Sequence, residues 1–228
     1  MEINLFTNYD GIDKHAYMNW RFWNKSEQYI LEVMSDSYLD ATTTLLNECL
    51  LDNKDKKADS LVFPILFSFN HYIELKLKSI FAYYNYLENN NKHLITMREK
   101  NILKLNTPYP HTHNINTLFK NLESTILASN LPKIEKDKER FSTLSSYLKQ
   151  LNKYQIFRDS PNMDFTRYPH SKNNGEYFYV KTYKNVTISL VGLSKIKDEV
   201  RIELEGLSDQ LEYYNELKKE MEESRDYY

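Results

Sequence analysis

The sequence contains very little glycine and a single cysteine. Glycine occurs four times in 228 residues. Neither G-x-G-x-x-G nor G-x-x-x-x-G-K-[ST] is present, which argues against a glycine-rich loop that cradles phosphates. Cys49 is the only cysteine, so an internal disulfide and any zinc site built on several cysteines are excluded. It falls on the apolar side of a predicted helix, where a buried structural thiol is the favoured interpretation.

The sequence also lacks a strong charge of one sign and a long apolar run. The formal net charge is −2, so no global basic field indicates DNA or RNA binding, although a local patch stays open. The longest apolar run, LVFPILFSF, is too short to span a bilayer, and the N-terminus has no signal-peptide pattern. We therefore expect a cytoplasmic protein without a membrane partner.

Hydrophobic residues at helical spacing predict a mainly α-helical bundle. Ser26 is a candidate N-cap for the first helical region. The predicted helices are one or two within residues 16–52, one from about Leu61 to Asn89, one beginning near Asn114, one from about Lys133 to Asn152, and a long one from Lys195 to the end.

One segment breaks the helical period. YFYVKTYKNVTISLV is rich in aromatic and β-branched residues, which predicts a short β-hairpin insert at residues 176–191. We expect a single helical domain over residues 1–228. Residues 1–55 form an N-terminal helical extension that packs on it, and residues 195–228 form a long C-terminal helix. The leucine spacing of that helix permits packing on its own domain or pairing with a second copy.

The segment HYIELKLK, residues 71–78, is the first candidate site. On a helix, His71, Glu74 and Lys78 fall within about 60° of one another, away from the apolar stripe. One interpretation is a solvated face with a weak i,i+4 salt bridge. The other is a histidine whose protonation is tuned by the neighbouring carboxylate. Aromatic residues such as Phe67 crowd this face, which indicates that it packs against another part of the protein.

The segment PHTHN, residues 110–114, is the second candidate. His111 and His113 could chelate a metal from an extended segment, but two histidines without a nearby carboxylate or cysteine are a weak metal motif. The favoured interpretation is that His113 and Asn114 begin a helix and that His113 turns inward. We therefore expect no metal site.

The third candidate is FRDSPNMDFTRYPH, residues 157–170, in which a proline follows Tyr168 and disfavours helix there. Arg167 offers a rigid fork of donors that suits a carboxylate or a phosphate. One interpretation is an internal clamp, in which Arg167 pairs with Glu74 and holds the loop to the helix. The other is a ligand site that includes Tyr168 and His170. Both stay open, and they are compatible.

Three segments in order resemble bacterial HEPN-like proteins. NHYIELKLKSIF follows an H-x-x-E-L-x-L-K pattern, HTHNINTLFKNL follows H-[DN]-[LI]-x-x-L, and FTRYP follows F-x-R-Y-P. The resemblance covers roughly residues 60–210. The matching positions are His71, Glu74, Leu75, Leu77, Lys78, His113, Asn114, Ile115, Leu118, Arg167, Tyr168 and Pro169.

The resemblance implies a helical bundle that forms a homodimer and belongs to a bacterial defence or toxin–antitoxin system. Many HEPN proteins cut RNA without a metal, using an arginine followed four to six residues later by a histidine. This chain departs from that motif, because no histidine follows Arg158 at positions 163–165, and Arg167 and His170 are only three apart. We therefore expect a HEPN-like protein that binds a partner protein, a nucleotide or RNA, without a cofactor.

The alternative is a divergent metal-independent ribonuclease. RNA cleavage needs a base for the 2′-hydroxyl, an acid for the leaving oxygen and a cation for the phosphorane charge. This hypothesis predicts that His71, His113 and Arg167 converge in one pocket. The candidate catalytic residues are His71, Glu74, His113 and Arg167, and the candidate ligand-binding residues are Lys78, Asn114, Tyr168 and His170.

Overall fold

The computed structural model describes residues 16–18, 21–87, 109–129, 139–154, 163–171, 175–181 and 185–225. Most of these residues are helical, so the prediction of a mainly α fold is confirmed. The elements are α1 (Glu27–Leu51), α2 (Ala58–Leu87), α4 (Ile115–Ala128), α5 (Ser142–Lys153), the 3-10 helix η2 (Asp164–Thr166), α7 (Phe178–Lys181) and α8 (Leu190–Arg225).

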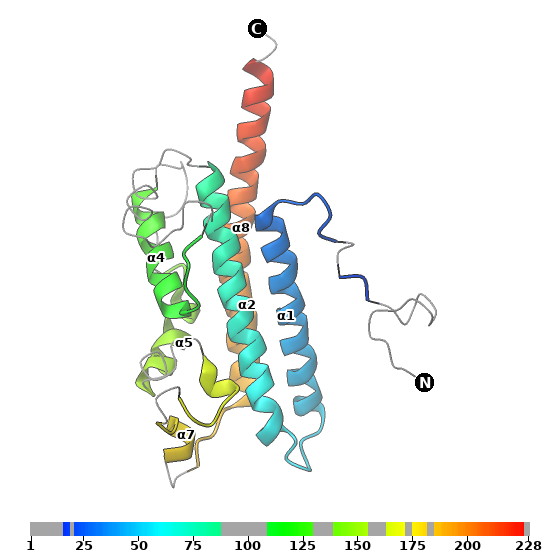
Figure 1. Cartoon of the computed structure of the whole chain (residues 1–228), viewed down its shortest axis with the longest axis vertical. Helices are drawn as coiled ribbons and strands as arrows, with labels where there is room; N and C mark the ends of the chain where they lie inside the picture. Colours follow the sequence, from blue (N-terminus) through cyan, green and yellow to red (C-terminus); the bar gives the residue numbers. More distant parts are fainter. Residues whose placement is uncertain are drawn as a thin grey trace.

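Helix α2 occupies the centre of the bundle (Figure 1). Helices α1 and α8 lie along it, α4 packs on it from another side, and α5 contacts α8. Because it is surrounded, α2 buries side chains on almost all of its faces, as expected for a helix that is apolar all round. Its fully buried large side chains include Ile65, Phe69, Tyr72, Ile73, Leu77, Ile80, Phe81 and Tyr84.

Local capping explains where several helices begin. The Asn114 side chain accepts a hydrogen bond of 3.0 Å from the backbone N–H of Thr117, which satisfies an orphan donor and starts α4 at the predicted place. Ser26 occupies the N-cap position of α1, but its side chain makes no capping hydrogen bond. Helix α5 begins at Ser142, later than expected, and its exposed backbone N–H groups are capped by the Glu203 carboxylate of α8.

Helix α8 packs on its own domain. Val200, Leu204 and Leu207 are buried in the core it shares with α2, α1 and α5, which answers one question that the leucine spacing left open. Ile202, by contrast, is 57% exposed, because it lies on the opposite side of the helix from Leu204. The C-terminal turns of α8 project beyond the rest of the bundle (Figure 1).

This orientation of α8 predicts opposite effects for two neighbouring substitutions. Leu204→Ala removes a fully buried side chain and is expected to lower the free energy of unfolding by about 3 kcal/mol. Ile202→Ala trims an exposed side chain and should change it by less than about 0.5 kcal/mol. Urea denaturation of both variants measures the difference. Equal losses would show that α8 is rotated from the described orientation.

The predicted hairpin at residues 176–191 is wrong for the part of that range that the structure describes. Residues Phe178–Lys181 form the short helix α7, and residues 185–189 have no regular structure. Only an isolated antiparallel bridge joins Glu176 to His170. The reason is tertiary: Tyr177 is buried in the core, and Tyr179 is hydrogen-bonded to the loop around η2. Such anchoring overrides the β propensity of the aromatic residues.

The described helices include none that is both long and apolar enough to cross a membrane. Helix α1, which lies within the expected N-terminal extension, runs along α2 rather than apart from it (Figure 1). Arg158, the arginine considered above for the ribonuclease motif, lies outside the described residues.

Candidate functional site

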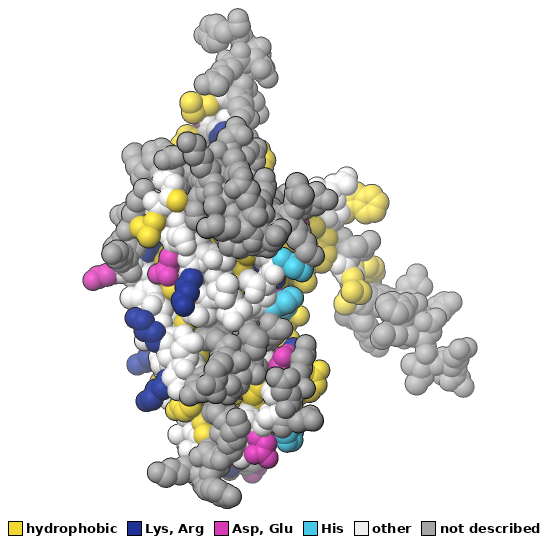
Figure 2. All heavy atoms as spheres, turned by 60° about the vertical axis from the view of Figure 1, so that its left-hand side comes forward, with side chains coloured by type: hydrophobic (Ala, Val, Ile, Leu, Met, Phe, Trp, Pro, Cys, Tyr) yellow, Lys and Arg dark blue, Asp and Glu magenta, His cyan; other side chains and the backbone are white. Residues whose placement is uncertain are grey.

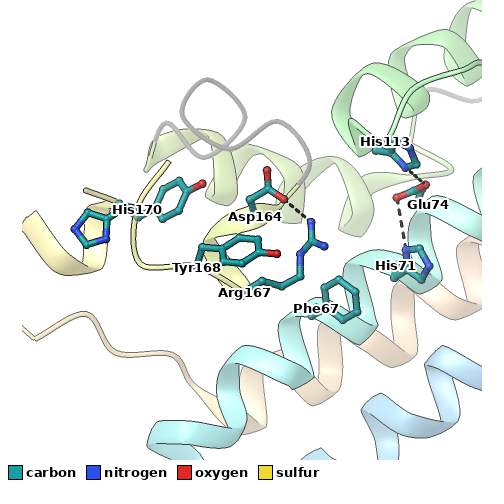
Figure 3. Close-up of a pocket in the computed structure, with 9 residues that line it drawn as sticks. Phe67, His71, Glu74, His113, Asp164, Arg167, Tyr168 and His170 are labelled. Carbon is teal, nitrogen blue, oxygen red and sulfur yellow. Dashed lines mark hydrogen bonds and ion pairs between the residues drawn. The ribbon is translucent and has the colours of Figure 1, made fainter. Parts of the chain in front are cut away.

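Side chains from separate parts of the sequence line one open cavity of about 510 Å³. They come from α2, from the segment before α4, from η2 and the loop after it, and from the residue just before α7 (Figure 3). Figure 2 shows histidine side chains at the surface on the right-hand side of the view, at mid-height and again lower down. The lining residues are Phe67, His71, Glu74, His113, Asp164, Arg167, Tyr168, His170 and Tyr177. The predicted convergence of His71, His113 and Arg167 on one pocket is therefore confirmed.

Glu74 is the centre of a buried polar network. Its Oε1 lies 2.7 Å from Nζ of Lys78 and 2.9 Å from Nδ1 of His113, and its Oε2 lies 3.6 Å from Nδ1 of His71. The i,i+3 and i,i+4 spacing places His71 and Lys78 on the same face of α2 as Glu74. Because Glu74 and Lys78 are both buried, the interpretation of this face as solvated is wrong.

These partners determine the protonation of Glu74. Burial alone raises the pKa of the carboxyl group, but the contacts with His71 and Lys78 and the charges of Lys78 and His113 outweigh it and hold the pKa at about 2. Glu74 is therefore ionised at neutral pH and can only accept hydrogen bonds. It follows that Nδ1 of His113 carries the hydrogen, and the nearby carboxylate favours the same tautomer for His71. In both rings Nε2 is the nitrogen not committed to Glu74.

The low pKa of Glu74 predicts a loss of stability in acid. A carboxyl group whose pKa is lowered by folding stabilises the protein fully above its unfolded value of 4.5, and this contribution is lost as pH falls toward about 2. The contribution is on the order of 3 kcal/mol. Denaturation of the natural protein and of Glu74→Gln at several pH values measures it. The difference between the two should shrink below about pH 4.5, and a constant difference would contradict the assignment.

The two histidines beside Glu74 are held differently. The His71 ring contacts Tyr38 of α1, at 4.3 Å and 85°, and Phe67, at 5.7 Å and 11°. Tyr38 and Phe67 also contact each other, so this cluster of three rings fixes the orientation of His71. His113 is 62% exposed and precedes the N-cap residue Asn114, so the start of α4 fixes its backbone. His71 is thus packed into the wall of the cavity, whereas His113 is exposed to solvent.

Arg167 lies on the opposite side of the cavity from this network, between it and His170 (Figure 3). Its Nη2 donates to Oδ1 of Asp164, and its guanidinium lies 5.5 Å from the ring centres of both Phe67 and Tyr168. The predicted clamp between Arg167 and Glu74 is therefore wrong. Asp164, three residues earlier on the same turn, is the partner, because a local carboxylate reaches the arginine without crossing the cavity.

The loop that carries Arg167 is held in place by contacts with the core and with the segment around α7. Phe165 is buried in the core, and the Tyr179 hydroxyl lies 3.0 Å from the carbonyl oxygens of both Phe165 and Tyr168. The backbone N–H of Tyr177 donates to the carbonyl of Pro169 at 3.3 Å. These contacts place the arginine on a fixed backbone, even though part of its side chain is exposed.

Two predicted ligand-binding residues do not line the cavity. Lys78 contacts the Glu74 carboxylate, and its Nζ lies 5.6 Å from the centre of the Tyr109 ring. Asn114 caps α4 through Thr117. Both residues therefore hold other parts of the site in position and do not face the cavity themselves.

Three lining residues were not predicted as part of the site. Phe67 precedes His71 by one helical turn, and Asp164 precedes Arg167 by three residues, so spacing alone could have indicated both. Tyr177 carries no such signal, because only the fold brings it to the cavity.

The donor set does not form a metal centre. Among the described residues, no group of three or more His, Cys, Asp or Glu side chains is arranged to hold a metal ion. His111 is exposed and does not line the cavity. Comparisons with protein-family models, with curated proteins and with solved structures found no match to this chain.

Proposed function

We propose that this chain is a HEPN-like helical protein of a bacterial defence or toxin–antitoxin system, and that the cavity binds a phosphate group of a nucleotide or RNA. The observation that carries the proposal is the meeting of His71, His113 and Arg167 at one cavity. They come from the three separate segments that resemble HEPN-like proteins.

The chemistry of the cavity suits a phosphate ligand. Arginine carries five N–H donors in a planar fork, and Arg167 uses Nη2 for Asp164, which leaves donors for a second anion. His71 and His113 face the same space from the other side. The volume of about 510 Å³ lies in the range of small-ligand pockets. It fits a nucleotide unit better than a duplex.

Metal-independent RNA cleavage is the second candidate function. What favours it is the pair of histidines held by one carboxylate across from an arginine. One Nε2 would remove the 2′-hydroxyl proton as that oxygen attacks phosphorus, and the other imidazole, protonated, would give a proton to the leaving 5′-oxygen. Arg167 would stabilise the negative charge that develops on the phosphorane.

One experiment tests both candidates. Purified protein is mixed with labelled single-stranded RNA in EDTA, and anisotropy and gel analysis report binding and cleavage. The proposal expects binding that is lost in His71→Ala and Arg167→Ala and kept in His111→Gln. Cleavage lost in the same two variants would establish the nuclease. RNA and nucleotide binding absent from the natural protein would overturn the proposal.

The system and the assembly are tested separately. An antitoxin or helicase-type gene beside this one would support the defence context, as would toxicity on expression. The same resemblance leads us to expect a homodimer, which light scattering tests directly. A purified protein that stays monomeric at all concentrations would contradict the dimer.

A further inference from the structure

We infer that the cavity binds its phosphate as a dianion and takes up protons on His71 and His113 when it does so. This inference rests on the proposed function, because it concerns the same site. The inference specifies the charge of the phosphate and of the histidines in the complex, and therefore the pH range in which the ligand binds.

The first argument is the balance of fixed charges. In the described part of the site, Glu74 pairs with Lys78 on one side of the cavity and Asp164 pairs with Arg167 on the other, so two negative charges face two positive ones. These charges cancel, so at high pH the site offers a dianion little net attraction. Among the described residues that line the cavity, the ones that can add positive charge are its three histidines, His71, His113 and His170.

The second argument is hydrogen bonding. The carboxylate of Glu74 holds the hydrogen of His113 at Nδ1 and favours the same tautomer for His71. A neutral imidazole in this tautomer presents Nε2 as an acceptor. Phosphate oxygens without protons are acceptors too, so the two cannot bond. Once Nε2 is protonated it becomes a donor, and the ring gains a positive charge facing the ligand.

Apart from the third histidine of the cavity, His170, the groups around His71 and His113 do not change charge in the same pH range. Histidine is the side chain that titrates between about pH 5 and pH 8, whereas tyrosine hydroxyls as a class ionise well above it. The titratable and charged groups that face the two rings are Tyr38 from α1, Glu74 and Lys78 from α2, and Asp164, Arg167, Tyr168, His170 and Tyr177 across the cavity.

Sulfate is the sharpest probe, because it stays a dianion throughout this range, whereas a phosphate monoester loses its second proton near pH 6. Calorimetric titration of the full chain with sulfate is repeated from about pH 5.5 to about pH 8. We expect the association constant to fall as pH rises, by up to about tenfold per pH unit for each proton taken up. Heats in two buffers of different ionisation enthalpy count those protons.

Parallel titrations identify the source of the phosphate. Uridine monophosphate offers a terminal dianionic phosphate, and a short RNA without terminal phosphates offers only monoanionic diesters. The inference expects uridine monophosphate to bind with proton uptake. It also expects the affinity for the monophosphate to be higher than the affinity for the short RNA. Tighter binding of the RNA, without proton uptake, would overturn it.

Variants separate this inference from the proposed function. His113→Gln should remove about one proton from the uptake, and its fold should be kept because the side chain is exposed. His111→Gln, a neighbouring exposed histidine outside the cavity, should leave the uptake unchanged. Binding that depends on Arg167 but not on pH would overturn the proton coupling and leave the proposed function standing. No binding of any probe at any pH would overturn both.

Discussion

Replacing Glu74 with alanine is expected to lower the free energy of unfolding by about 3–5 kcal/mol. The carboxylate is the partner of the buried Lys78 ammonium and of two histidines. Without it, the charge of Lys78 stays buried and unpaired, which costs more than the ion pair itself contributes. Urea denaturation at neutral pH, with circular dichroism as the readout, measures the change.

A surface ion pair provides the matched control. Glu48 pairs with Lys57 at 2.5 Å, but the Glu48 side chain is 60% exposed. Glu48→Ala is therefore expected to cost less than about 1 kcal/mol. A second control removes both buried charges: Lys78→Met combined with Glu74→Ala should recover part of the lost stability. If the double variant is less stable than Glu74→Ala alone, burial of the unpaired ammonium is not the cause.

Replacing Arg167 with glutamine is expected to weaken nucleotide and RNA binding by about tenfold to a hundredfold. This is the range for losing a hydrogen bond to a charged group. The side chain is 44% exposed and its backbone is held by Phe165 and Tyr179, so stability should change little. Titration with uridine monophosphate, beside a thermal unfolding scan, measures both quantities.

Arg201 allows a close control for this variant. Its side chain is also 44% exposed and also pairs with a carboxylate on its own helix, Glu205, but it lies on α8 and does not line the cavity. Arg201→Gln should leave binding unchanged. Arg167→Lys keeps the charge without the planar fork and should give an intermediate affinity. Equal losses for Arg201→Gln and Arg167→Gln would mean that general charge, not the cavity, attracts the ligand.

The sequence predicts well those features that local spacing determines. The long apolar run of α2, the Asn114 cap of α4 and the grouping of His71, Glu74 and Lys78 each depend on residues within a few turns. The hairpin prediction failed because Tyr177 and Tyr179 are fixed by the distant segment around η2. No local pattern contains that contact.

The candidate site shows the same division. His113 and Arg167 come close to α2 because of how the chain between these segments folds back onto α2. In the sequence, only the order of the three motifs indicated this proximity. The partner of Arg167 was predicted wrongly. Glu74 was chosen because it belongs to a recognisable motif, whereas the actual partner, Asp164, lies only three residues before Arg167. Whether His71 and His113 act as catalytic groups stays a prediction.

The most direct test of the central claim is NMR of the histidine ring nitrogens during addition of uridine monophosphate. The account predicts that His71 and His113 start with their hydrogen on Nδ1, and that both rings take up a proton from the buffer on Nε2 when the nucleotide binds. His111, outside the cavity, should keep its signals. Ring signals of His71 and His113 that do not move at millimolar nucleotide, or that move no more than those of His111, would contradict phosphate binding at this cavity.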